Sequence, residues 1–212
     1  MGKINQGILG GFSGKVGTVI GGNWKGITYM RAKAVSVANP RTEAQQSQRA
    51  KFNLAVRFLQ PCTDFLRRGY KNYAIKKTAF NAAMSYTLSN VITGTYPTFS
   101  IDYSKAMLSR GTLTTAANVQ ATIAGGVVKI SWDDNSTSGS AKPTDSALAI
   151  VVNPDNGEAV YNIAGAKRSG CMEQLNIPAD WTGDQVEVYL GFISEDGKEV
   201  SNSVYAGSVM VA

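Results

Sequence analysis

The C-terminal part of the chain, from Asn118 onward, alternates short hydrophobic stretches with turn-forming residues. The stretches read VQATI, VVKISW, ALAIVV, AVYNI, CMEQLNI, QVEVYLGFIS and SVYAGSVMV. Gly, Pro, Asn and Asp occupy the segments between them, as in Gly125-Gly126 and Asn153–Gly157. Seven short strands with frequent turns predict an all-β sandwich of the immunoglobulin type.

Helical periodicity dominates the region before this one. Thr42-Glu43-Ala44-Gln45 fits a capping box, which predicts a helix start. The apolar positions of the following helix are Phe52, Ala55, Leu59, Cys62 and Leu66. Pro61 lies within this run and predicts a kink or a break into two helices.

A further helix and a mixed connector are predicted next. Thr78 is a candidate N-cap, with apolar residues at helical spacing up to Val91, and Gly94 is the expected end of the helix. Residues 94–117 form a connector in which Phe99 to Tyr103 is the expected strand.

The first part of the chain, residues 7–37, combines glycines with strand-forming residues. GGFSGKVGTVI and GGNWKGITYM look like a degenerate pair, and a hairpin about Gly21-Gly22-Asn23 would join them. Glycine weakens a strand, and a two-stranded ribbon is marginal alone. We therefore expect this element to pack on another surface, in this chain or in a neighbouring copy.

These patterns predict an α+β fold in two domains. Residues 1–110 would hold the glycine-rich β-hairpin and basic helices, and residues 111–212 the all-β sandwich. The sandwich resembles a fibronectin type III module, because GGVVKISWDD matches its second strand and VEVYLGFISEDGKEVSNSVYAG its sixth strand and final hairpin. That resemblance implies that Trp132 and Tyr189 are core residues of the sandwich.

A second resemblance covers nearly the whole chain. GILGGFSGKVGTVIGGNWKGITYMR, NPRTEAQQSQRAKF and GFISEDGKEVSNSVYAGSV together resemble an uncharacterised family from Bacteroidota and their phages. No activity is assigned to that family, so the resemblance implies no functional residues. The NPRTEAQQSQRAKF segment is also similar to segments of phage structural proteins.

Charge is divided unevenly along the chain. The net charge is +6, but residues 1–110 carry +13 and residues 111–212 carry −7. Three interpretations remain open. The basic half could bind nucleic acid, it could bind the acidic half of a neighbouring copy, or the two halves could neutralise each other within one molecule.

Residues with catalytic or metal-binding chemistry are scarce. There is no His, and Cys62 and Cys171 are far apart, so both are read as buried thiols. Val16 stands where a phosphate-binding loop would need Ser or Thr. The set Asp133, Asp134, Asn135 and Asp145 fits a polar sandwich loop better than a calcium site. We therefore predict a protein that is not an enzyme, with no cofactor, no metal and no small-molecule substrate.

The predicted localisation depends only on sequence features that the chain lacks. The first residues lack the apolar stretch of a signal peptide, and no run of about 18 apolar residues occurs. These observations favour a virion or the cytoplasm over a membrane.

The function predicted from the sequence is self-assembly into a homo-oligomer, in a structural protein of phage or virion type, through the basic N-terminal part. The expected contact residues are Lys15, Trp24, Lys25, Tyr29, Arg31, Arg49 and Arg57. One alternative is nucleic-acid binding by the same basic and aromatic residues. A second alternative is adhesion or binding through the sandwich.

Overall fold

The computed structural model describes residues 3–4, 10–24, 26–36 and 41–211. Strands in antiparallel sheets predominate, together with a smaller number of helices. The chain divides into two compact units, Met1–Thr42 and Glu43–Ala212. The sequence analysis predicted a domain boundary after residue 110, whereas the two compact units meet between residues 42 and 43. The difference arises because the helices share a hydrophobic core with the C-terminal strands.

The first unit is a four-stranded antiparallel sheet in the order β1-β2-β3-β4. Its strands are β1 (Lys3–Ile4), β2 (Phe12–Val16), β3 (Val19–Trp24) and β4 (Ile27–Ala32). The predicted turn at Gly21-Gly22-Asn23 is wrong, because these residues form the middle of β3. The chain instead reverses near Gly17 and Gly26, which adopt the positive φ angles of 58° and 88° that favour glycine.

The glycines within β3 have a packing role. A Cβ atom at Gly21 would overlap the backbone and ring of Phe12, and one at Gly22 would lie 2.9 Å from the Tyr29 ring. Both glycines therefore leave room for an aromatic ring to lie over the strand.

The helices of the second unit are α1 (Glu43–Leu59), α2 (Thr63–Gly69) and α3 (Ala79–Asn90). The break at Pro61 is confirmed, since α1 ends before it and α2 begins after it. Thr78 caps α3, as expected, by accepting a hydrogen bond from the Asn81 amide at 3.1 Å. Gly94 does not end this helix. It lies in β5 (Ile92–Thr95), which forms a hairpin with β6 (Thr98–Ile101).

All seven predicted C-terminal strands are present and form two antiparallel sheets. They are β7 (Ala117–Ala124), β8 (Val127–Asp133), β9 (Ser146–Asn153), β10 (Glu158–Asn162), β11 (Met172–Asn176), β12 (Gln185–Ile193) and β13 (Val204–Met210). One sheet has the order β10-β9-β12-β13 and the other the order β11-β8-β7.

One hydrophobic core lies between these two sheets. Trp132 on β8 is 3 % exposed and packs edge-on against Phe192 of β12, with 5.5 Å between ring centroids. The expectation that Trp132 is a core residue is confirmed. The same core includes Ala149 and Val151 of β9, Leu190 of β12 and Ile130 of β8.

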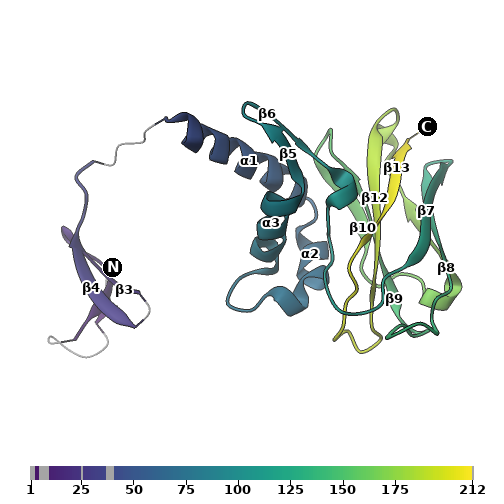
Figure 1. Ribbon diagram of the computed structural model, residues 1–212, viewed down its shortest axis with the longest axis horizontal. Coiled ribbons are helices and arrows are strands. Elements are labelled where there is room, and N and C mark those ends of the chain that lie inside the picture. The colour runs from purple at the N-terminus through teal and green to yellow at the C-terminus, as the bar shows by residue number, and fades with distance from the viewer. Residues whose placement is uncertain (1–2, 5–9, 25, 37–40, 212) are drawn as a thin grey trace. The chain divides into compact units, whose positions relative to one another are not determined.

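A second core lies on the opposite face of the β10-β9-β12-β13 sheet, where the helices cover it. Leu148 and Ile150 of β9 pack there with Phe58 and Phe65 of the helices. In Figure 1 the second unit accordingly shows helices, then this sheet, then the sheet containing β7 and β8. The two central strands, β9 and β12, are therefore buried on both faces, which explains the apolar runs Ala147–Val152 and Val188–Ile193.

Tyr189 belongs to this second core and not to the core between the two sheets. Its hydroxyl donates a hydrogen bond to the backbone carbonyl of Tyr103 at 2.9 Å. The expectation that Tyr189 is buried is confirmed, but the core to which it was assigned is wrong. On β12, Val188 and Leu190 face the other sheet, so the intervening Tyr189 faces the helices.

Candidate functional site

The strand register of the first unit gathers four of the predicted contact residues on one face. Residues directly opposite each other on neighbouring strands point to the same side of a sheet. Ile20 lies opposite both Lys15 and Arg31, Gly22 lies opposite Tyr29, and Trp24 lies opposite Ile27. We call this the aromatic-basic face. It is made by Lys15, Ile20, Trp24, Ile27, Tyr29 and Arg31.

Large side chains on this face are accessible to a partner. Trp24 is 63 % exposed, Ile27 is 65 % exposed and Tyr29 is 45 % exposed. Lys15 and Arg31 are exposed as well. Trp, Tyr and Arg are the residue types most enriched where binding energy concentrates in protein interfaces.

The opposite face of the sheet is mostly apolar, with Asn23 and Thr28 as its polar members. It carries Val16, Val19 and Met30, and Met30 is 69 % exposed. None of the described residues of the first unit belongs to either hydrophobic core. In the described part of this unit, β4 pairs with β3 alone, so it is an edge strand.

Positive charge is concentrated in the first unit. Residues 1–42 contain six Lys and Arg and no Asp or Glu. The remainder of the chain has equal numbers of basic and acidic residues, so the net charge of +6 resides in the first unit. Within that remainder, residues 43–110 are basic and residues 111–212 are acidic, and the two segments fold together.

The other predicted contact residues lie elsewhere. Lys25 is outside the described residues. Arg49 and Arg57 are both on α1, in the second unit. The sequence therefore grouped seven residues, of which the structure places four on a single surface.

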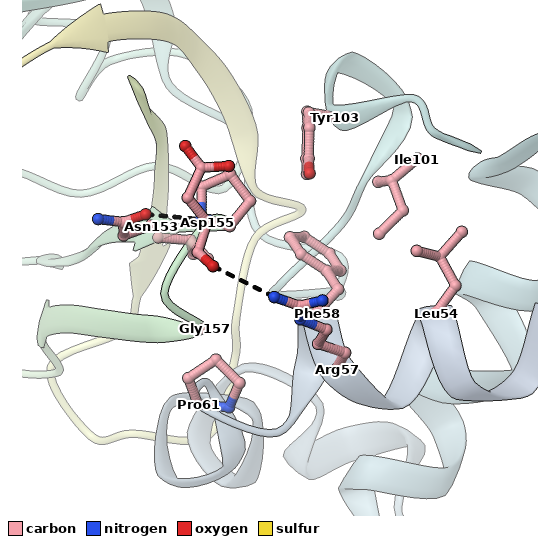
Figure 2. A pocket seen from close by; sticks show the side chains of 11 residues that line it. Leu54, Arg57, Phe58, Pro61, Ile101, Tyr103, Asn153, Asp155 and Gly157 are labelled. Carbon is pink, nitrogen blue, oxygen red and sulfur yellow. Dashed lines mark hydrogen bonds between the residues drawn. The ribbon is translucent and has the colours of Figure 1, made fainter. Parts of the chain in front are cut away.

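Arg57 lines a small pocket between α1 and the turn that follows β9 (Figure 2). Its guanidinium donates a hydrogen bond to the backbone carbonyl of Asp155 at 3.2 Å. The pocket has a volume of about 190 Å³, and Leu54, Phe58 and Ile101 form its apolar wall. This hydrogen bond joins α1 to the β9–β10 turn within the second unit.

Arg168 forms a buried polar cluster that the sequence did not indicate. It is fully buried and its Nε donates to Asp145 Oδ2 at 3.1 Å. Its other nitrogens donate to Asn135 Oδ1 at 2.7 Å and to the Thr114 carbonyl at 2.9 Å. Its guanidinium also lies over the Phe192 ring, 3.8 Å from the centroid.

Burial lowers the pKa of the Arg168 guanidinium, and the neighbouring Asp145 carboxylate opposes this shift. Asn135 and Asp145, which the sequence analysis weighed as oxygen donors for calcium, are instead acceptors for Arg168. The sequence did contain one indication of this cluster, since Asp145 stands directly before the apolar strand β9. A carboxylate that is buried at such a point needs a cationic partner.

The two cysteines have different surroundings. Cys62 is fully buried between the helices and the sheet, and burial raises the pKa of its thiol to about 12. Cys171 is only partly buried, so the expectation of a buried thiol is confirmed for Cys62 alone.

Across the described ranges, no cluster of three or more Cys, Asp or Glu side chains is arranged to hold a metal ion. No helix in the part of the chain that the structure describes is long and apolar enough to cross a membrane.

Comparison with known proteins identifies the family of this chain but indicates no activity. No curated protein and no solved structure matches the chain. One family model, described as a family of unknown function (DUF6266), matches residues 11–207. Because this match spans both units and almost the whole length, the chain belongs to the DUF6266 family.

Proposed function

We propose that this protein is a non-enzymatic assembly protein that self-associates through the aromatic-basic face of its N-terminal sheet. The observation that carries the proposal is a four-stranded sheet with large apolar side chains exposed and, among the described residues of its own unit, no covering layer. A sheet gains stability when a face is buried against another layer. A neighbouring copy supplies that layer in an assembly.

The charge distribution supports a head-to-tail contact. The N-terminal unit carries only positive charge, whereas the second unit has no net charge but contains an acidic segment, residues 111–212, with a charge of −7. Opposite charges on two different surfaces favour contact between unlike surfaces of two copies. Such heterologous contacts repeat, so they produce rings or filaments and not a closed dimer.

The β4 edge offers a second element for the same contact. β4 has six residues, Ile27–Ala32, and its outer edge is unpaired within the described residues. A neighbouring chain can add main-chain hydrogen bonds along such an edge. The side chains of the aromatic-basic face would then fix the register.

The C-terminal part of the chain would be a fibronectin type III-like sandwich that serves as the rigid body of the subunit. Their orders, β10-β9-β12-β13 and β11-β8-β7, divide seven strands between two packed sheets as such modules do. The resemblance of residues 39–52 to phage structural proteins suggests a phage particle as the setting of the assembly.

Sedimentation velocity of the full chain over a wide concentration range, at low and high salt, tests the proposal. We expect species larger than a monomer at low salt, and weaker association at high salt. A strict monomer under all conditions would contradict the proposal.

A matched pair of variants locates the surface. Ile27 and Met30 are exposed to similar extents on opposite faces of the sheet. Ile27→Ser should weaken association about tenfold, since removing a large apolar side chain from an interface costs on the order of 1 kcal/mol or more. Met30→Ser should leave association unchanged. The reverse pattern would assign the contact to the other face.

The aromatic-basic face also favours a second candidate function, binding of single-stranded nucleic acid. Trp24 and Tyr29 are exposed aromatic rings on the same face as Lys15 and Arg31. Bases stack on such rings while cations neutralise phosphates. A fluorescence titration with random single-stranded DNA across salt concentrations tests this candidate. Binding with a steep salt dependence supports it, and no binding at low salt excludes it.

A further inference from the structure

A cavity with an acidic lining lies at one end of the second unit. Its volume is about 470 Å³. Its walls come from the loop before β9, the turn after β12, and Leu113. The lining carboxylates are Asp145, Glu195, Asp196 and Glu199, and the lining cations are Lys142 and Lys198.

Asp145 contributes a buried acceptor to this cavity. Its side chain is fully buried, and Oδ2 accepts hydrogen bonds from Arg168 Nε at 3.1 Å and from the Lys142 amide at 2.8 Å. Its second oxygen, Oδ1, is also buried and has no hydrogen-bond partner among the described residues. An unsatisfied buried acceptor is costly, so a donor that reached it would bind favourably.

The lining of the cavity keeps a net negative charge of −1, because Asp145 is paired with Arg168 and Asp196 with Lys198, which leaves Glu195 and Glu199 against Lys142. Lys198 pairs with Asp196, with 3.1 Å between Nζ and Oδ2. The side chains of Glu195 and Glu199 are exposed and make no hydrogen bond or ion pair with the described residues. The cavity therefore combines two accessible carboxylates with one buried acceptor, a combination that favours a cationic hydrogen-bond donor.

The N-terminal sheet displays groups with this chemistry. Lys15 on β2 and Arg31 on β4 lie on either side of Ile20 on β3. Two strand spacings separate them, which is about 10 Å. Residues 1–42 contain no acidic side chain that would compete for these cations.

We infer that the cavity of one copy receives Lys15 or Arg31 from the aromatic-basic face of a second copy. This inference rests on the proposed function and names the surface to which the N-terminal sheet binds. A metal ion is the weaker occupant, because within the described residues no three carboxylates or thiols are arranged to hold one.

Two variants with opposite defects test the inference. The donor variant is Lys15→Glu with Arg31→Glu, and the cavity variant is Glu195→Gln with Glu199→Gln. Each alone should associate at least tenfold more weakly than the wild-type chain. A 1:1 mixture should form dimers and nothing longer, because the intact sheet of one variant meets the intact cavity of the other.

The cavity variant leaves Asp145 in place because Arg168 depends on it. A control with Asp133→Asn and Asp180→Asn removes the same charge from exposed positions outside the cavity lining, and it should assemble as the wild-type chain does. Circular dichroism and thermal unfolding should show that all three variants are folded.

The outcomes separate this inference from the proposed function. If the wild-type chain assembles and the cavity variant assembles equally well, the inference is overturned and the proposed function stands. If each variant is monomeric and their mixture is monomeric too, the head-to-tail pairing is overturned. If the wild-type chain is a monomer under all conditions, the proposed function itself fails.

Discussion

Among the described residues, two four-stranded antiparallel sheets differ in how their faces are covered. In β10-β9-β12-β13, the two central strands are buried on both faces, by helices on one side and by a second sheet on the other. In β1-β2-β3-β4, no layer from the described part of the same unit covers either face, and Trp24, Ile27 and Met30 are largely exposed.

Side-chain composition explains the difference. The central strands of the covered sheet, β9 and β12, contain runs of Ala, Val, Leu, Ile and Phe that supply apolar area on both sides. The central strands of the N-terminal sheet contain Gly14, Gly21 and Gly22, which supply none. The covered sheet therefore has apolar side chains for a core on each of its faces, whereas the glycines of the N-terminal sheet leave it with fewer.

The largest effect on stability is expected at Arg168, where the covered sheet ends in a buried charge pair. Arg168→Ala would leave the Asp145 carboxylate buried without its cation and remove the group that lies over Phe192. We expect the free energy of unfolding to fall by about 3–5 kcal/mol, measured by denaturant titration. Lys167→Ala, at the exposed neighbouring position, is the control. A loss below about 1 kcal/mol at Arg168 would contradict this account.

The next effect concerns the packing inside the N-terminal sheet. Gly21→Val would place a side chain against the backbone and ring of Phe12. Overpacking of this kind costs about 1–3 kcal/mol. Hydrogen exchange of amides in residues 12–32 should become faster, while exchange in β9 and β12 stays unchanged. The control is Thr28→Val on β4, in which the side chain keeps its shape. It should leave the exchange rates of both regions unchanged. Slowed exchange in Gly21→Val would show that this glycine is not required by packing.

A smaller effect is expected where the helices meet the covered sheet. Tyr189→Phe removes the hydrogen bond to the Tyr103 carbonyl and keeps the ring in the core. We expect a loss of about 0.5–1.5 kcal/mol in the free energy of unfolding. Tyr86→Phe is the control, because the Tyr86 hydroxyl makes only a long, exposed contact of 3.4 Å to the Lys105 carbonyl. Equal effects in both variants would argue against a specific role for the Tyr189 hydroxyl.

The smallest effect on folding is expected at the exposed faces of the N-terminal sheet. Ile27→Ser and Met30→Ser should each change the stability of the monomer by less than about 0.5 kcal/mol, because neither side chain is buried there. Thermal unfolding at a concentration where the chain is monomeric measures this. A large loss would show that these side chains are packed within the monomer, which would remove the basis of the comparison.

Much of the local structure could be predicted from residue patterns. The seven C-terminal strands follow the alternation of hydrophobic segments and turn residues, and the break between α1 and α2 follows Pro61. Thr78 was recognisable as a cap because a hydroxyl before an apolar helical pattern satisfies a free backbone amide. These features depend on residues a few positions apart.

The candidate site was predictable only in part. Aromatic and basic residues were visible along the N-terminal segment, but the register of β2, β3 and β4 decided that Lys15, Trp24, Tyr29 and Arg31 share a face. The expected turn at Gly21-Gly22-Asn23 would have given another register. Glycine fits both turns and crowded strands, so composition alone did not distinguish the two.

The amino-acid sequence by itself determined where the C-terminal strands form, where α1 and α2 separate, the concentration of positive charge before Glu43, and the absence of His. The tertiary structure decided which faces are buried. It placed Tyr189 against the carbonyl of Tyr103, gave Arg168 its partners from three distant segments, and left Trp24, Ile27 and Met30 of the N-terminal sheet exposed. The physical reason is that backbone conformation responds to near neighbours, whereas burial depends on surfaces that meet only after the chain has folded.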